Sequence, residues 1–150
     1  MTDLYAIVDL GTNTFHVLIA SKTGKKEANI LLAKKIPVKI GEGGINQGYI
    51  SPQAFERGLE ACKTFETLIK DYDANHVKVL GTSAIRNASN SSEFVDSIEA
   101  IFNSSIQIID GDKEAELIYY GVRWAIGMWN NPSLIMDIGG GSVEFIIANQ

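Results

Sequence analysis

The chain has 150 residues, of which 45% are hydrophobic and 21% charged, with a formal net charge of −5. This length suits one globular domain with a substantial core, and the composition excludes a disordered chain, a collagen-like chain and a small disulfide-rich scaffold. No apolar run approaches the roughly 20 residues that a membrane helix needs, no signal peptide precedes the first apolar segment, and Cys62 is the only cysteine. We therefore expect a cytoplasmic protein that neither spans nor binds a membrane.

The charged side chains are distributed unevenly along the chain. Residues 79–150 contain three basic and nine acidic side chains, whereas residues 1–78 are almost balanced. An acidic balance argues against a nucleic-acid partner. The second half is therefore where we look for carboxylates that bind a metal or transfer protons.

The first forty residues read as three successive strands. Segments 4–10, 14–21 and 29–40 are rich in apolar and β-branched residues, and glycine-containing turns at 11–13 and 24–25 separate them. Strands joined by such short turns pair with their neighbours, so we expect an antiparallel meander.

The rest of the chain alternates helices with short strands. Ser51-Pro52 predicts the start of a helix that runs to about Tyr72. Asn90 and Glu93 look like a capping pair for a second helix, and a third is expected over 113–129. Strands are expected at 77–80, 106–109, 134–136 and 143–148. The order β-β-β-α-β-α-β-α-β-β predicts a three-layer α/β fold with a mixed sheet.

The third helix is expected to bury one side in the core. The proposed inner face consists of Ile118, Gly121, Val122 and Ala125. We interpret the aromatic residues of this helix as packing groups: Tyr119, Tyr120, Trp124 and Trp129.

One internal repeat stands out. Residues 7–14 and 135–142 share an apolar strand, an aspartate (Asp9 or Asp137), an apolar residue and a glycine turn with hydroxyls. Such a repeat indicates two related lobes. We expect residues 1–132 to form an N-terminal lobe and residues 133–150 the first two strands of a truncated second lobe, so that the chain is part of a longer protein.

The glycine turns of this repeat could bind an anion, and the aspartates before them could bind a cation beside it. Without a Cβ in the way, backbone N–H groups of glycine turns converge on an anion, as Gly11-Thr12-Asn13 and Gly139-Gly140-Gly141-Ser142 allow. Asp9 and Asp137 suit a hard divalent cation held partly through water. The alternative is that both merely cap turns, which the repetition disfavours. Glu144 completes the set unless it only faces solvent.

Two further segments carry candidate groups. Asp112, Glu114 and Glu116 lie in a helix N-terminus, where the macrodipole keeps a carboxylate ionised and suits it as a base for water, although spacing alone does not choose among them. Thr82-Ser83 and Arg86 follow a buried strand, where open α/β sheets bind ligands. His16 and His76 lack metal-ligand spacing, which favours structural roles.

Five segments together resemble the exopolyphosphatase/guanosine pentaphosphate phosphohydrolase (Ppx/GppA) family. They are residues 9–16, 41–43, 82–88, 114–118 and 137–144. The resemblance implies an actin-like ATPase domain, ribonuclease H-like, with a mixed five-stranded sheet. It also implies an enzyme that hydrolyses the terminal phosphate of inorganic polyphosphate by in-line attack of water.

The resemblance further implies a role for each candidate residue. Glu114 would be the base that activates water, and Lys113 beside it would lower its pKa. Asp137 and Glu144, with Asp9 as a further candidate, would hold Mg²⁺. The phosphate-binding residues would be Gly11, Thr12, Asn13, Thr82, Ser83, Arg86, Gly139, Gly140, Gly141 and Ser142.

Several alternatives stay open. Guanosine pentaphosphate (pppGpp) is the first alternative substrate, and a kinase of the same superfamily is the second. A non-enzymatic actin-like scaffold or polyphosphate-binding module is the third. The oligomeric state is open, with a homodimer as one alternative. Because the family's second lobe closes the cleft, we expect the 150 residues alone to have little activity.

Overall fold

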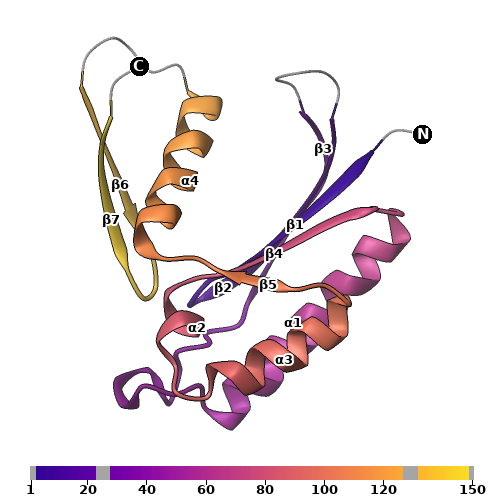
Figure 1. The fold of residues 1–150 in the computed structure, drawn as a ribbon, viewed down its shortest axis with the longest axis vertical. Coiled ribbons are helices and arrows are strands. Elements are labelled where there is room, and N and C mark those ends of the chain that lie inside the picture. The colour runs from indigo at the N-terminus through magenta and orange to yellow at the C-terminus, as the bar shows by residue number, and fades with distance from the viewer. Residues whose placement is uncertain (1–2, 23–27, 127–131, 149–150) are drawn as a thin grey trace.

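The computed structural model describes residues 3–22, 28–126 and 132–148. Its central element is a five-stranded mixed sheet in the order β3-β2-β1-β4-β5 (Figure 1). The strands are β1 (Leu4–Leu10), β2 (Thr14–Lys22), β3 (Ala28–Pro37), β4 (His76–Gly81) and β5 (Ile106–Ile108). β1 pairs antiparallel with β2 and parallel with β4, so the expected meander is confirmed as one half of a mixed sheet. The turn expected at 24–25 lies outside the described residues.

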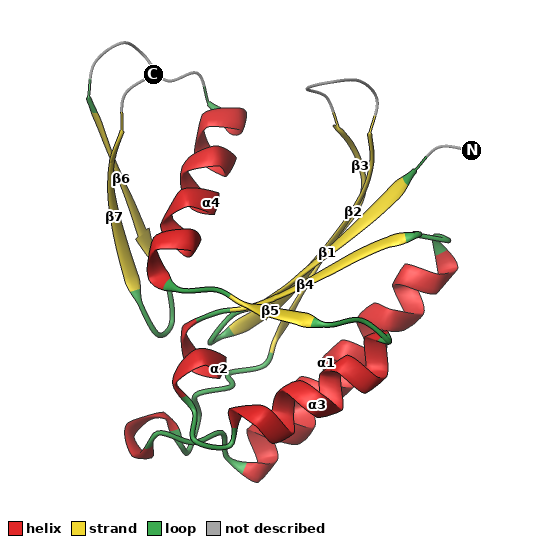
Figure 2. Ribbon diagram, viewed as in Figure 1, coloured by secondary structure: helices red, strands yellow, loops and turns green. Residues whose placement is uncertain are grey.

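Helices lie on both sides of this sheet. α1 (Pro52–Asp71) and α3 (Ser91–Phe102) cover one face, while α4 (Gly111–Ala125) lies on the other side with a separate two-stranded sheet (Figures 1 and 2). That sheet consists of β6 (Ser133–Ile138) and β7 (Val143–Ala148). Two short elements that the sequence pattern did not predict are η1 (Ile45–Gln47) and α2 (Ser83–Asn87). Within the described ranges, every helix is too short or too polar to cross a membrane.

The core lies between the sheet and the helix pair α1/α3. Successive side chains of a strand point to opposite faces, so alternate residues of β1 and β2 enter this core. They are Ala6, Val8, Leu10, Phe15, Val17 and Ile19, each at most 1% exposed. Cys62 of α1 is fully buried among them, and this burial raises the pKa of its thiol to about 12. Cys62 is therefore a core residue of α1.

Of the two expected helix caps, one is confirmed in full and the other only in position, because Asn90 precedes α3 but its side chain makes no capping hydrogen bond. Ser51 caps α1 as predicted, accepting a hydrogen bond from the Ala54 N–H (3.4 Å). The Asn90 side chain instead binds both backbone groups of Ile50, accepting from its N–H at 2.8 Å and donating to its carbonyl at 2.9 Å. An amide presents the same donor and acceptor as a backbone unit, so Asn90 ties the loop before α1 to the start of α3.

The expected inner face of α4 is wrong within the described residues. The helix ends at Ala125, no residue of it is buried, and Tyr120 and Trp124 are 52% and 62% exposed. Trp129 lies outside the described residues. α4 packs against β7, and Ile118 and Val122 of the expected inner face are only half-buried. The outer face of the β6–β7 sheet is likewise exposed, with side chains at least 50% accessible at Leu134, Met136, Ile138, Val143, Phe145 and Ile147.

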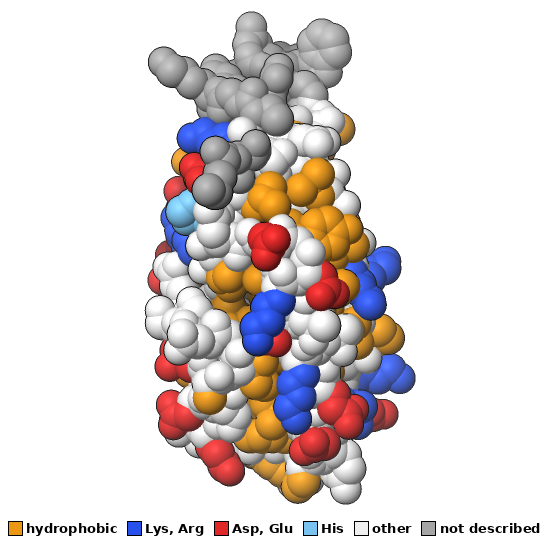
Figure 3. Space-filling view, turned by 90° about the vertical axis from the view of Figure 1, so that its right-hand side faces the viewer, with side chains coloured by type: hydrophobic (Ala, Val, Ile, Leu, Met, Phe, Trp, Pro, Cys, Tyr) orange, Lys and Arg blue, Asp and Glu red, His pale blue; other side chains and the backbone are white. Residues whose placement is uncertain are grey.

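Acidic and basic side chains are interspersed over the side of the molecule drawn in Figure 3. Nucleic acid requires a concentration of basic groups, which this side of the described structure does not offer.

Gly58 of α1 provides a test of how closely the two core helices pack. A Cβ at this position would lie 2.6 Å from Cζ of Phe94, whose buried ring packs edge-on against Phe55. Gly58→Ala therefore destabilises the fold by about 1–3 kcal/mol through overpacking, although alanine in a helix interior ordinarily stabilises by about 1 kcal/mol.

The matched control is Gly121 of α4, where a Cβ would meet nothing within 4 Å. Gly121→Ala should stabilise by about 0.5–1 kcal/mol. Urea titrations of both variants measure the two effects, and equal stabilisation by both would show that α1 and α3 are not packed as described.

Candidate functional site

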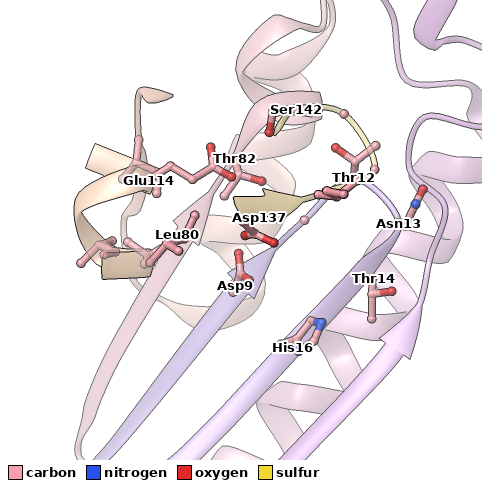
Figure 4. Close-up of a pocket in the computed structure, with 18 residues that line it drawn as sticks. Asp9, Thr12, Asn13, Thr14, His16, Leu80, Thr82, Glu114, Asp137 and Ser142 are labelled. Carbon is pink, nitrogen blue, oxygen red and sulfur yellow. The ribbon is translucent and has the colours of Figure 1, made fainter. Parts of the chain in front are cut away.

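A cleft of about 640 Å³ opens between the C-terminal ends of β1, β4 and β6 and the start of α4. Eleven of the residues selected from the sequence line it: Asp9, Gly11, Thr12, Asn13, Thr82, Glu114, Asp137, Gly139, Gly140, Gly141 and Ser142. They come from segments far apart in the chain (Figure 4). The parallel strands β1 and β4 end at the same edge of the five-stranded sheet, and α4 and the separate β6–β7 sheet bring the other residues to that edge. Ser83, Arg86 and Glu144 lie beside the cleft but not among its lining residues.

The two glycine turns of the internal repeat lie against each other. A Cβ at Gly140 would overlap the side chain of Asn13, and one at Gly141 would lie 2.5 Å from Oγ1 of Thr12. A side chain at either position would force the Asn13 or Thr12 side chain to move, so glycine favours this close approach of the turns. The Asn13 carbonyl also accepts hydrogen bonds from the N–H groups of Val38 and Lys39 (both 2.9 Å), which fixes the first turn.

The segment Thr82–Arg86 contacts both turns and α4. Thr82 Oγ1 donates to the Leu10 carbonyl (3.3 Å), and Ser83 Oγ donates to the Gly141 carbonyl (3.0 Å). Arg86 Nη1 donates to the Ile109 carbonyl (2.5 Å) just before α4. Ser83 and Arg86 were selected as phosphate ligands, but these hydrogen bonds commit the Ser83 hydroxyl and Arg86 Nη1 to the protein itself.

Glu114 lies in the first turn of α4, which Asp110 caps by accepting the Lys113 N–H at 2.7 Å. Its side chain is 16% exposed, and one carboxylate oxygen lies 3.5 Å from Arg86 Nη1. Burial, and then the charge of Glu144, raise the pKa of Glu114, whereas Arg86 opposes this rise. The expected lowering by Lys113 is wrong, because the Lys113 ammonium pairs with Glu116 at 2.6 Å.

The remaining carboxylates lie on β1, β6 and β7. Burial raises the pKa of Asp9 most, Asp137 adds to the rise, and His16 opposes it. Asp137 and Glu144 are cross-strand neighbours, and Glu144 is only 9% exposed. Acidic groups thus approach one another from three strands and from α4.

This donor set fits a magnesium ion bound partly through its substrate. Carboxylate oxygen is the ligand that Mg²⁺ prefers, and the ion is usually held by one or two carboxylates with water and phosphate completing the shell. The described residues contain no group of three His, Cys, Asp or Glu side chains arranged to coordinate a metal by themselves. Asp9 and Asp137, whose charges repel each other, are the pair that a cation would stabilise.

His16 is the cleft residue that sequence reasoning misjudged. It lines the cleft, and the β1–β2 register places it directly opposite Asp9. The signal was available: the short turn at 11–13 sets the hairpin register, and counting back from it pairs positions 9 and 16. His76 lies outside the cleft, where its ring stacks on Tyr5 at 4.6 Å.

Comparison with known proteins gives consistent results. A family model described as the Ppx/GppA phosphatase family matches residues 18–150. The guanosine-5'-triphosphate,3'-diphosphate pyrophosphatases of Aeromonas hydrophila and Aeromonas salmonicida are each 36% identical to the chain over 147 residues, which is 98% of this chain and 29% of those proteins.

Among solved structures, an exopolyphosphatase from Cytophaga hutchinsonii is 42% identical with a TM-score of 0.93, matched over 98% of this chain and 47% of that one. The Aquifex aeolicus PPX-GPPA enzyme is 25% identical with a TM-score of 0.84, over 99% of this chain and 49% of that one. The chain thus spans less than a third of the curated relatives and about half of these structures. The fold expected from the sequence is confirmed.

The charge of Asp9 should cost stability in the absence of metal. Folding raises the pKa of Asp9 above its ordinary value of 3.8, which means that the folded state binds the proton more strongly than the unfolded state. At neutral pH the Asp9 carboxylate is ionised in both states, and its charge therefore destabilises the folded state. With a chelator present, Asp9→Asn should therefore stabilise the chain at pH 7 by about 0.5–2 kcal/mol.

The gain should shrink as the pH falls toward 3.8, because Asp9 of the wild type then takes up its proton, first in the folded state. Thermal melts from pH 7 to pH 4 measure the difference. Asp112→Asn, at an exposed position in the first turn of α4, is the control and should give no gain. A Tm for Asp9→Asn at or below that of the wild type at pH 7 contradicts this account.

Proposed function

The chain belongs to the Ppx/GppA phosphatase family, and we propose that its cleft removes the terminal phosphate of inorganic polyphosphate. The observation that carries this proposal is the arrangement of Glu114 and the two glycine turns around one cleft. Figure 4 shows Glu114 extending from α4 on one side, Asp9 and Asp137 in the middle with Ser142 above them, and Thr12 and Asn13 on the other side. A base, a cation site and an anion site are the groups that phosphoanhydride hydrolysis needs.

In the proposed reaction Glu114 accepts a proton from a water molecule in the cleft. The water oxygen forms a bond to the terminal phosphorus, the bridging P–O bond breaks, and its electron pair leaves with the shortened chain. Backbone N–H groups of the turns, with the hydroxyls of Thr12 and Ser142, bind the oxygens of the released orthophosphate. Because these donors are already oriented, they stabilise the charge that develops in the transition state.

The charge of the cleft supports a requirement for Mg²⁺. Three carboxylates, Asp9, Glu114 and Asp137, are among its lining residues, and His16 is the one basic side chain among the lining residues that the structure describes. A polyanion entering such a cleft is repelled unless a divalent cation offsets the acidic groups. Asp9 and Asp137 would hold the ion, with Glu144 behind them. When bound, Mg²⁺ neutralises and orients phosphate oxygens.

The 5′-phosphate of pppGpp is the second candidate substrate. The Aeromonas relatives, which are 36% identical to the chain, are named for that activity. The Cytophaga protein, which is 42% identical, is named an exopolyphosphatase. Both substrates present a terminal phosphoanhydride, so the same base and turns serve either. Phosphate release from each substrate by the complete protein decides between them: a higher kcat/KM for pppGpp makes it the principal substrate.

Glu114→Gln should remove the base and keep the substrate site. In the complete protein with Mg²⁺, we expect kcat for phosphate release from polyphosphate to fall about 10²–10⁴-fold with little change in KM. The wild-type rate should fall on acidification at a pH above the ordinary Glu value of 4.5, because the pKa of Glu114 is raised, and the variant should lack this limb.

The matched control is Glu116→Gln, since Glu116 lies half a turn away, faces solvent and pairs with Lys113. It should keep wild-type activity. If Glu114→Gln keeps it too, Glu114 is not the base.

The 150 residues alone should release phosphate from polyphosphate at least about 100-fold more slowly than the complete protein. The reason is that one side of the cleft is formed by an isolated β6–β7 pair whose outer face is exposed, so the site is not held closed. A malachite-green assay at equal molar concentrations measures the ratio, and equal rates contradict the expectation.

A further inference from the structure

We propose that Arg86 is a positioning residue for the base Glu114, and not a ligand of the substrate phosphates. The inference rests on the proposed function, because it concerns how that base is held. Its starting point is the placement of the guanidinium: Arg86 is absent from the residues that line the cleft, and its side chain is 27% exposed.

The contacts of Arg86 are directed at α4. One nitrogen, Nη1, donates to the Ile109 carbonyl at 2.5 Å and lies 3.5 Å from Oε2 of Glu114. The carbonyl is a fixed backbone group, whereas the glutamate side chain has three rotatable bonds. Because the Ile109 carbonyl holds the guanidinium in place, Glu114 is restricted to the rotamers that keep its carboxylate close to Nη1.

The backbone that carries Arg86 is anchored in the core. Ile85, the neighbour of Arg86 in α2, is fully buried in the core, and the Arg86 N–H donates to the Thr82 carbonyl at 2.9 Å. Thr82 and Ser83 bind the carbonyls of Leu10 and Gly141 in turn. The same five residues thus fix the first turn, the second turn and, through Arg86, the glutamate that faces them.

The charged groups around Glu114 support the same role for Arg86. Burial, Glu144 on β7 and Asp9 on β1 all raise the pKa of Glu114, and Arg86 is the group whose hydrogen bond and charge lower it. A general base must be ionised to act, so loss of the guanidinium would leave Glu114 both less restrained and protonated at higher pH.

The test is steady-state kinetics of the complete protein with Mg²⁺ and polyphosphate. For Arg86→Gln we expect kcat to fall about 10–100-fold, by analogy with the outer-shell partners that orient metal ligands, while KM stays within about twofold. The acid limb of kcat should move to higher pH. Arg86→Lys, which keeps the charge, should restore the limb and most of kcat.

A double-mutant cycle separates this role from phosphate binding. If Arg86 acts through Glu114, Arg86→Gln should change kcat little in the Glu114→Gln background. Arg123→Gln, on an exposed part of α4, is the control and should leave all parameters unchanged. Circular dichroism melts confirm that each variant is folded at the assay temperature.

Two kinetic results would overturn the proposal: a KM raised tenfold or more with kcat and its acid limb unchanged, or an undiminished effect of Arg86→Gln in the Glu114→Gln background. Either result makes Arg86 a phosphate ligand. Failure of the proposed function is distinguishable, since Glu114→Gln alone would then keep full activity. An NMR titration of the Glu114 carboxyl carbon in the wild type and in Arg86→Gln gives a readout independent of turnover, and an unchanged pKa contradicts the proposal.

Discussion

The close approach of two backbone turns is the constraint on which the site depends. Gly140 and Gly141 lie where a Cβ would meet the side chains of Asn13 and Thr12, so glycine lets the second turn dock on the first without moving them. Because the turns belong to different sheets, this contact also determines where the β6–β7 pair lies relative to β1. The Ser83 hydroxyl, bound to the Gly141 carbonyl, holds the contact from the side. Asp9 and Asp137, two residues before each turn, are brought together as a consequence.

Much of the fold could be predicted because its signals are local. The alternation of buried positions in β1 and β2, the Ser51-Pro52 start of α1 and the apolar face of α3 each need only a few neighbouring residues. The cleft residues Asp9, Asp137 and Glu114 could also be selected, since the repeated Asp-x-Gly pattern and the acidic first turn of α4 are visible in the sequence. Shared motifs with the family pointed to the same residues.

The remainder depends on tertiary contacts that no local pattern encodes. α2 is only five residues long, too short for helical periodicity, yet it carries Ser83 and Arg86 to their partners. Asn90 resembles a cap but binds Ile50, forty positions away in sequence. The apolar stripe of α4 predicts full burial, and only the arrangement of the sheets shows that none of its residues is fully buried. The pKa of Glu114 follows from burial and from Glu144, not from its neighbour Lys113.

The central claim is that the two glycine turns form a single anion site beside a carboxylate pair that requires a cation. The most direct measurement is a ¹⁵N–¹H NMR titration of the chain with tripolyphosphate, in the presence and absence of Mg²⁺. The account predicts that backbone amides of Gly11–Thr14 and Gly139–Ser142 shift together, with one binding constant, and only when Mg²⁺ is present. Shifts confined to one turn, separate constants for the two turns, or the same affinity without Mg²⁺ would contradict it.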